Sequence, residues 1–318
     1  MKSIIYNQYG GAQVLQIAEI PKPIISNRQV LVKVEAAGLN PKDSILRNGD
    51  RFAKILTGNK FPKQTGFDFS GTVVEVGKNV NNYKIGDEVF GFINYLVGGT
   101  LAEYLAIRHD WIALKPKSLS HVTMASIPCA YLTALQVLRD VGKIEIKKKV
   151  LIYGASGGVG TAAIQLASYY GADITSVSSS KNQSYCKLQG AGFTLAYDKG
   201  DIWNAVEHDY DLIFEVFDQG GKLYKRAKKY LKKGGVFVTL TPNPTALLKS
   251  LFSFTLERRF QQFMIRTRTN DLLLIGDLVE KRQITPQIQT FKFHETIQAF
   301  EILDSHHSIG KIVIEINK

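Results

Sequence analysis

Residues 150–160 read VLIYGASGGVG, and this stretch decides the fold of the chain around it. The apolar run at its start predicts a strand that is covered on both faces, as strands of parallel sheets are. The glycines that follow predict a tight turn, and the alanine-rich residues 161–170 predict a helix that begins there. A strand, a glycine-rich turn and a helix in this order form the first half of a βαβ unit.

The same stretch predicts a dinucleotide site. Glycine lets the backbone approach a pyrophosphate closely, and the amides at the start of the helix face the anion. A strand-to-helix turn that merely favours glycine is the alternative, but the strand and helix on either side favour the dinucleotide. The residues expected to line the loop are Ala155, Ser156, Gly157, Gly158 and Val159.

Outward from the loop, the chain has two kinds of pattern. Up to about residue 115, short β-runs such as 30–34, 71–77 and 87–91 are separated by turn residues and predict a partly closed β-barrel or sandwich. From about residue 121, strands and helices alternate, which predicts a parallel sheet with helices on both faces. The expected strands there are 150–153, 174–178, 193–197, 211–217 and 236–240; the expected helices are 161–170, 181–189 and 222–231, followed by helices at 271–281 and 295–303 and a last strand at 311–316.

Composition limits the classes of protein that remain. The chain has 318 residues, which suits two domains, and its net charge of +12 favours an anionic partner such as nucleic acid, a membrane surface or a phosphorylated cofactor. Cys129 and Cys186 are its two cysteines, which excludes a disulfide framework and a four-cysteine zinc site. The first residues read as a strand and not as a signal peptide, and the apolar residues 245–256 are too few to span a bilayer, so we expect a cytoplasmic protein.

The end of the second βα strand bears on which dinucleotide binds. An NAD site usually carries an acidic residue there, which holds the ribose 2′-hydroxyl. Residues 176–181 read SVSSSK instead, and hydroxyls with a lysine favour the 2′-phosphate of NADPH. A serine-rich helix cap with an exposed lysine is the alternative. Phe217 and Leu240 end the fourth and fifth strands, where a doubly wound sheet binds ligands, although either could belong to the core.

Five stretches carry a resemblance to a known family: 38–43 (GLNPKD), 66–71 (GFDFSG) with Val73, Val76 and Gly77, 86–91 (GDEVFG), 99–104 (GTLAEY) and the glycine loop. In their order and spacing the sequence resembles the medium-chain dehydrogenase/reductase superfamily, in its zinc-free quinone oxidoreductase and enone reductase branch. The resemblance implies an α/β fold in which a Rossmann doubly wound parallel sheet is inserted beside a GroES-like β-barrel domain. It implies a GroES-like catalytic domain over residues 1–120, a Rossmann cofactor-binding domain over 121–268 and a C-terminal return to the catalytic domain over 269–318.

The resemblance also implies the substrate-side residues. Zinc-dependent members have a cysteine where Asn40 stands and a histidine where Phe67 stands, and neither replacement can bind zinc, so we expect no metal site. The resemblance puts Asn40 beside the nicotinamide, with Asp43 as a second catalytic candidate. A helix start capped by Asn or Asp would explain the same residues.

Further cofactor contacts are implied by the resemblance alone. Two of these contacts have another explanation: Thr133, within a helix, can bond back to its own helix, and Tyr197, at a strand end, can cap the core. Just before the last strand, Ile309 stands where the C-terminal segment of the family has an arginine. One of the two cations of that segment is therefore missing, and the lysine, Lys311, remains. The implied contacts are Thr133 through its hydroxyl, Lys181 and Tyr197 at the 2′-phosphate with Ser178 or Ser179 beside them, and Lys311.

Together these features predict an NADPH-dependent, zinc-independent oxidoreductase that transfers hydride to quinones or α,β-unsaturated carbonyls. By resemblance we expect a homodimer, and we expect neither a membrane nor a nucleic-acid partner. The alternative is a non-catalytic NADPH-binding redox sensor or RNA-binding relative, because residues 222–233 form a basic run; a solvated helix face explains that run as well. Residues 245–254 could cover the substrate site, form a dimer contact or build a buried helix.

Overall fold

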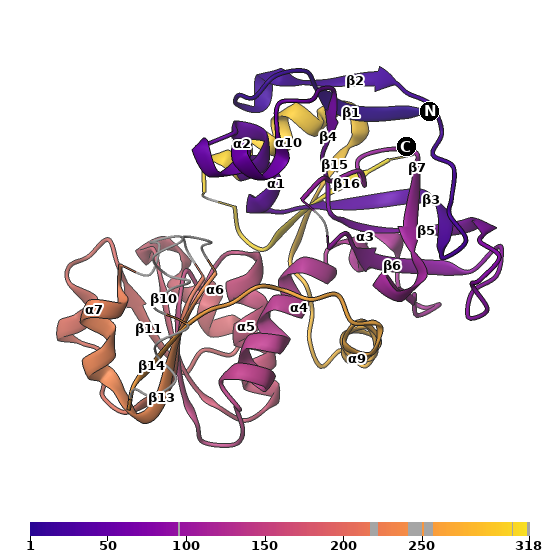
Figure 1. Cartoon of the computed structure of the whole chain (residues 1–318). Coiled ribbons are helices and arrows are strands. Elements are labelled where there is room, and N and C mark those ends of the chain that lie inside the picture. Colours follow the sequence, from indigo (N-terminus) through magenta and orange to yellow (C-terminus); the bar gives the residue numbers. More distant parts are fainter. Residues whose placement is uncertain (95, 217–221, 241–249, 251–256, 307, 317–318) are drawn as a thin grey trace. The chain divides into compact units, whose positions relative to one another are not determined.

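A computed structural model of the chain describes residues 1–318 except 95, 217–221, 241–249, 251–256, 307 and 317–318 (Figure 1). Contacts divide it into two compact units. Unit 1 comprises Met1–Leu132, Arg266–Arg282 and Pro286–Lys318, and unit 2 comprises Thr133–Ile265 and Gln283–Thr285. The indigo and yellow ends of the chain therefore belong to one unit, and the magenta-to-orange middle belongs to the other. This is the arrangement of the expected fold, and the expected boundaries 1–120, 121–268 and 269–318 stay predictions.

Unit 2 is built on a six-stranded parallel sheet. Its spatial order, β11-β10-β9-β12-β13-β14, reverses direction between β9 and β12, which is the order of a doubly wound Rossmann sheet. The interior strands are apolar because helices cover both faces of such a sheet. The strands are β9 (Lys149–Tyr153), β10 (Asp173–Ser178), β11 (Phe193–Ala196), β12 (Tyr210–Glu215), β13 (Leu231–Thr239) and β14 (Arg259–Gln262).

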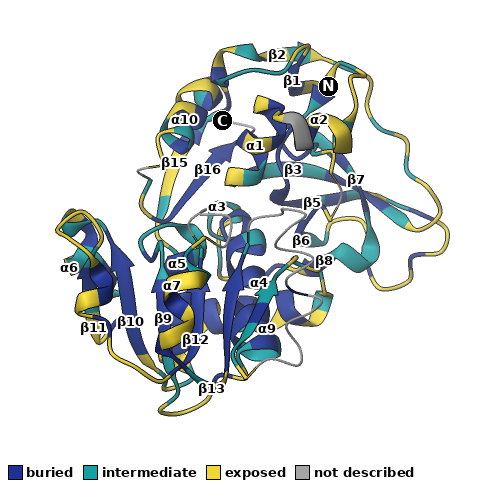
Figure 2. Ribbon diagram, turned by 60° about the vertical axis from the view of Figure 1, so that its left-hand side comes forward, coloured by how far each residue is buried: buried dark blue, intermediate teal, exposed yellow. Residues whose placement is uncertain are grey.

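Helices connect these strands and cover the sheet. Figure 2 shows β9, β10 and β12 as buried, whereas the outer faces of α6 and α7 carry exposed residues. The connecting elements are α5 (Gly158–Tyr169), α6 (Gln183–Leu188), α7 (Tyr224–Ala227) and the short turns η4 (Ser180–Asn182), η5 (Ile202–Asn204) and η6 (Lys228–Tyr230).

One expected helix of unit 2 is wrong in its length. We expected a helix over residues 222–231, but α7 ends at Ala227 and strand β13 already begins at Leu231. Leu231 pairs with Tyr210, and the register then shifts before Leu212 pairs with Val236. Gly234, at a φ of 80°, lies within the irregular segment, so the strand starts earlier than its apolar run.

Unit 1 contains two sheets. The smaller has the order β2-β1-β4, and the larger has the order β15-β16-β3-β5-β6-β8, with β7 also paired to β3. The expected β-runs at 30–34, 71–77 and 87–91 lie in or overlap β3, β5 and β6. The strands are β1 (Lys2–Tyr6), β2 (Leu15–Glu19), β3 (Gln29–Leu39), β4 (Lys63–Gln64), β5 (Asp68–Val76), β6 (Glu88–Phe92), β7 (Tyr104–Arg108), β8 (Ile112–Leu114), β15 (Ile288–Lys292) and β16 (Lys311–Glu315).

Short helices surround these sheets, and no helix among the described residues combines the length and apolar character needed to cross a membrane. The helix α4 starts in unit 1 and continues past Leu132. The helices are α1 (Pro41–Asn48), α2 (Arg51–Thr57), α3 (His121–Ala125), α4 (Pro128–Gln136, then a wider turn Val137–Val141), α9 (Thr269–Glu280) and α10 (Thr296–Asp304), with turns η1 (Ala12–Val14), η2 (His109–Trp111) and η8 (Phe293–Glu295).

The strand register of unit 1 brings three distant parts of the chain together. Leu39 pairs with Ile312 and Gly38 pairs with Asp68, so the end of β3 meets the starts of β16 and β5. There the ammonium of Lys311 lies 3.0 Å from the carboxylate of Asp68, and both side chains are almost fully buried. A buried ion pair therefore joins the returning C-terminal strand to the N-terminal sheet.

Replacing Lys311 by Met should destabilise unit 1 by about 3–5 kcal/mol, because Asp68 would keep a buried charge with no counter-ion. The double variant Lys311→Met/Asp68→Asn should recover part of that loss, since neither charge remains. Chemical denaturation measures the free energy of unfolding of all three proteins.

Lys292→Met is the matched control, because Lys292 pairs with Glu315 on the neighbouring strands but is itself half-exposed. Its cost should stay within about 1 kcal/mol. Equal costs for the Lys292 and Lys311 variants, or a double variant less stable than Lys311→Met, would contradict the assignment.

Candidate functional site

A buried polar cluster lies at the end of β3 and contains Asn40, the first catalytic candidate. Asn40 donates from Nδ2 to the Asp68 carboxylate at 3.0 Å, and its Oδ1 accepts from the Lys311 ammonium at 2.5 Å. Asp68 also accepts from the backbone amide of Cys129 at 2.8 Å. These contacts fix which side of the amide carries oxygen and which carries nitrogen, so the Asn40 side chain has one defined orientation.

Lys311, which we expected to contact the cofactor, donates its ammonium protons to acceptors within this cluster. It donates to the carbonyl oxygen of Leu39 at 2.8 Å, to Asn40 and to Asp68. An ammonium has three protons, and these three acceptors use all of them. Lys311 therefore positions Asn40 in this structure, and its contact with a cofactor stays a prediction.

The charge of Asp68 depends on two opposing effects. Burial is the largest effect and raises the pKa of Asp68 above its usual value, although the Lys311 charge and the hydrogen bonds from Asn40, Lys311 and Cys129 act to lower it. With donors on both oxygens, the arrangement suits an ionised carboxylate.

Asp43, the second catalytic candidate, is fully buried and anchors the backbone. One of its carboxylate oxygens accepts from the Thr65 hydroxyl at 2.9 Å and the Gly66 amide at 2.7 Å, and the other accepts from the Asn40 amide at 2.9 Å. Pro41 begins α1 just after Asn40, where a missing amide proton costs nothing. Asp43 thus joins the start of α1 to the segment before β5, so the helix start that we gave as the alternative explanation is present, and the catalytic roles of Asn40 and Asp43 stay predictions.

Two aromatic rings and a lysine lie beside the cluster. Phe67 and Phe92 are buried with ring centroids 6.2 Å apart, and the Lys42 ammonium lies 3.9 Å from the centroid of the Phe67 ring. Burial of the Cys129 thiol raises its pKa to about 12, and the Asp68 charge adds to this shift. A thiol with that pKa is not a nucleophile at neutral pH.

The glycine loop of unit 2 forms a tight turn between β9 and α5. Gly154, at a φ of 87°, turns the chain, and the amides of Gly154 and Ala155 both donate to the Val177 carbonyl at 3.0 Å. Helix α5 then begins at Gly158, with Gly157 as its N-cap and no side-chain cap. The first turn of a helix leaves amide protons without helical partners, so the loop offers donors to an anion.

Glycine occupies two positions of the loop for different reasons. A Cβ on Gly160 would lie 2.3 Å from the Gly154 carbonyl oxygen, so helix packing itself requires glycine there. A Cβ on Gly157 would meet its nearest described atom, the same oxygen, at 3.8 Å, an ordinary contact. The described fold therefore tolerates a side chain at Gly157.

The end of β10 contains an acidic group that the sequence did not reveal. We found no carboxylate in residues 176–181, but Asp198, which follows β11, accepts from both the amide and the hydroxyl of Ser180 at 2.8 Å. The parallel pairing of β10 with β11 brings their carboxyl ends together, and the Tyr197 amide donates to the Ser178 carbonyl at 3.0 Å. A carboxylate thus lies at the expected 2′-phosphate site.

The remaining expected residues are distributed as follows. Ser178 is buried and donates to the Ser179 carbonyl at 3.1 Å, whereas Lys181 and Tyr197 are exposed. Thr133 is buried on α4, and Leu240 is half-buried directly after β13. Phe217 and most of residues 245–254 lie outside the described residues.

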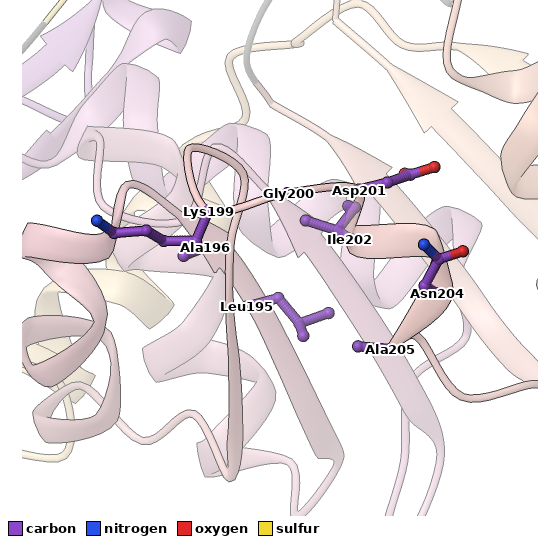
Figure 3. A pocket seen from close by; sticks show the side chains of 8 residues that line it. All are labelled: Leu195, Ala196, Lys199, Gly200, Asp201, Ile202, Asn204 and Ala205. Atoms are coloured by element: carbon purple, nitrogen blue, oxygen red, sulfur yellow. The ribbon is translucent and has the colours of Figure 1, made fainter.

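A shallow pocket of about 350 Å³ lies where β11 ends. Figure 3 shows the apolar side chains of Leu195, Ile202 and Ala205 at its middle, with Lys199 and Asp201 directed away. None of the expected site residues lines it, so it is not part of the candidate site.

Sequence reasoning missed Asp68, Lys42 and Asp198. The sequence did contain a signal for Asp68, because a carboxylate at the start of an apolar strand is expected to be buried and then needs a cation from elsewhere in the chain. Lys42 and Asp198 look like ordinary surface residues in sequence. Among the residues that the structure describes, no group of three His, Cys, Asp or Glu side chains could hold a metal ion.

Burial raises the pKa of Asp43 from 3.8 to about 6, although the three hydrogen bonds act to lower it. The folded protein thus binds this proton more tightly than the unfolded chain, so the stability that protonated Asp43 contributes is complete below pH 3.8 and is lost as the pH rises through about 6. Wild type should therefore lose stability relative to Asp43→Asn between these values. Denaturation curves at several pH values measure the difference, and parallel pH profiles for the two proteins would contradict it.

Comparisons with known proteins agree with this geometry. Residues 26–117 match the alcohol dehydrogenase GroES-like domain, and residues 189–314 match the zinc-binding dehydrogenase family. The chain is 33% identical to the 2-methylene-furan-3-one reductase of Solanum lycopersicum, over 99% of this chain and 79% of that protein. It is 32% identical to the NADPH-dependent alkenal/one oxidoreductase of Arabidopsis thaliana, with the same coverages.

A solved structure gives the same result. The quinone oxidoreductase from Coxiella burnetii superimposes with a TM-score of 0.93 at 33% identity, covering 100% of this chain and 99% of that one. The chain therefore belongs to the medium-chain dehydrogenase/reductase family of oxidoreductases, in its quinone oxidoreductase branch.

Proposed function

We propose that this protein transfers a hydride from NADPH to quinones or α,β-unsaturated carbonyls without a metal ion. The observation that carries the proposal is the glycine at position 157. The described fold does not require glycine there, whereas an anion bound closely at the start of α5 would require it. The bound dinucleotide would supply the hydride. The loop Ala155–Val159 would hold its pyrophosphate through the amides at the start of α5, and Ser179, Lys181 and Tyr197 would face its 2′-phosphate.

Asn40 would act at the reacting end. Its amide is oriented by Lys311 and Asp68, and one of its two amide protons is used by Asp68. The other can donate to a carbonyl oxygen of the nicotinamide or of the acceptor. Asp43 would position Asn40 through the backbone and not touch the reactants, because its oxygens are already occupied by three donors.

Independence from zinc is supported by the donor set. Neither Asn40 nor Phe67 supplies the thiolate or imidazole that zinc prefers. A conjugated acceptor needs less assistance than an alcohol, because the charge that develops on hydride addition spreads to oxygen and hydrogen-bond donors stabilise it. The names of the alkenal/one oxidoreductase and of the quinone oxidoreductase from Coxiella burnetii support this class of acceptor.

The choice of NADPH has one observation against it. Asp198 holds Ser180 at the end of β10, and an acidic group near that end is what NAD sites use. Lys181 is exposed two residues after Ser179 and supplies the opposite charge. We propose NADPH because the relative from Arabidopsis thaliana is named as NADPH-dependent.

The non-catalytic alternative draws on the basic run at residues 222–233. Carboxylates meet several of these cations: Arg226 pairs with Asp201, Lys232 with Asp211 and Lys233 with Glu257. Such pairing is typical of a solvated surface and weakens the case for nucleic acid.

Gly157→Ala should lower the affinity for NADPH at least tenfold, about 1.4 kcal/mol, because the methyl group would occupy the phosphate space. The melting temperature should stay close to that of wild type, since the new Cβ meets no described atom closer than 3.8 Å. Isothermal titration calorimetry and thermal unfolding measure the two quantities. Gly192→Ala is the matched control, because its Cβ would meet the Ile174 carbonyl oxygen at the same 3.8 Å; equal NADPH affinities for both variants would contradict the cradle.

The purified protein should oxidise NADPH when a small enone or quinone is added, followed as loss of absorbance at the nicotinamide band. Lys181→Met should lower kcat/KM for NADPH by about tenfold, the loss expected of one charge-assisted contact, and leave NADH unchanged. Lys187→Met, an exposed lysine on α6, serves as control. Tight binding of NADPH with no turnover across the acceptor panel would favour the redox-sensor alternative. A preference for NADH would indicate that Asp198, and not Lys181, determines which cofactor binds at the end of β10.

A further inference from the structure

Lys42 is a half-buried cation beside the Asn40 cluster to which the proposed function gives no role. It is the second residue of α1, and its ammonium lies over the Phe67 ring at 3.9 Å and within 5.3 Å of the Phe92 ring centroid. Aromatic faces attract an ammonium through its whole charge and do not require a particular N–H. The two rings therefore help to hold the charge in place.

The surroundings of Lys42 act on its acidity in two directions. Burial lowers the pKa of Lys42 and is the largest effect, whereas the negative charges of Asp43 and Asp68 act to raise it. The two carboxylates are occupied by other donors, namely Asn40 and Gly66 at Asp43 and Lys311 and Cys129 at Asp68. Lys42 is thus held as a cation that gives up its proton more readily than a surface lysine.

The position of this charge matters for a reductase without zinc. The resemblance to zinc-dependent members puts their ligands at Asn40 and Phe67, and here the Lys42 ammonium lies on the Phe67 ring, two residues from Asn40. A positive charge therefore stands next to the residues where those relatives bind a positive ion. A fixed cation at developing negative charge stabilises a transition state as a metal does.

We infer that Lys42 binds the carbonyl oxygen of the acceptor and donates a proton to it. This inference rests on the proposed hydride transfer and names a proton donor for it. The acceptor's β-carbon receives the hydride and its electron pair, the electrons of the carbon–carbon double bond move toward oxygen, and a Lys42 N–H proton passes to that oxygen. The products are the enol and the oxidised cofactor; the neutral amine recovers a proton from water, and the enol becomes the saturated carbonyl in solution.

The test compares Lys42→Met with Lys42→Arg. Methionine keeps the length of the side chain without charge or donor, so kcat with an enone should fall by about a hundredfold or more, the contribution of a general acid. Arginine keeps charge and donors and should retain more activity than methionine. The dissociation constant for NADPH and the melting temperature should stay near wild type in both variants.

Lys54→Met is the matched control, because Lys54 is an exposed lysine on α2 whose ammonium also lies over a ring, 5.4 Å from the centroid of Tyr9. Its kinetics should match wild type. A second readout needs no turnover: 4-nitrophenolate imitates the developing enolate, and its absorbance reports the ionised form. With the oxidised cofactor present, wild type and Lys54→Met should bind it, and Lys42→Met should bind it at least tenfold more weakly.

The outcomes separate this inference from the function on which it rests. An active wild type with an equally active Lys42→Met, or equal binding of 4-nitrophenolate by both, overturns the role of Lys42 and leaves the proposed function standing. A wild type that turns over no enone or quinone overturns both.

Discussion

Unit 1 depends on the buried ion pair between Lys311 and Asp68. The two residues are 243 positions apart, and between them the chain forms the whole of unit 2. A charge taken out of water needs a partner, and each of these residues is the partner of the other. Because Lys311 begins β16 and Asp68 begins β5, satisfying the charges brings the returning C-terminal strand to the end of β3.

The same pair prepares the chemistry of the site. Asn40 lies between the two charges and can bond to both only with its oxygen toward Lys311 and its nitrogen toward Asp68. Asp43 fixes the backbone of Asn40 independently, through the start of α1. One buried cluster therefore does two tasks: it closes the sheet, and it presents an oriented amide with a second cation, Lys42, on the neighbouring aromatic rings.

The sequence predicted unit 2 better than unit 1, for physical reasons. Parallel strands covered on both faces, such as β9 at residues 149–153, are continuous apolar runs, and the glycine loop marks where the helix begins. The buried cluster of unit 1 joins residues 40, 68, 129 and 311, whose proximity depends on strand register over the whole chain. The resemblance pointed to Asn40 and Lys311. The structure was needed to show that Lys311 and Asp68 both bind the Asn40 side chain and each other, and that Asp198 bonds to Ser180.

The central claim is that an organic acceptor receives hydride from a nicotinamide bound by this chain. Its most direct test is isotopic: the protein is given NADPH that carries deuterium at C4 on the face it transfers, together with an enone, and the product is examined by NMR. The account predicts deuterium at the β-carbon of the saturated product and a solvent-derived proton at the α-carbon. Reduction with no deuterium at the β-carbon from either C4 face would contradict it.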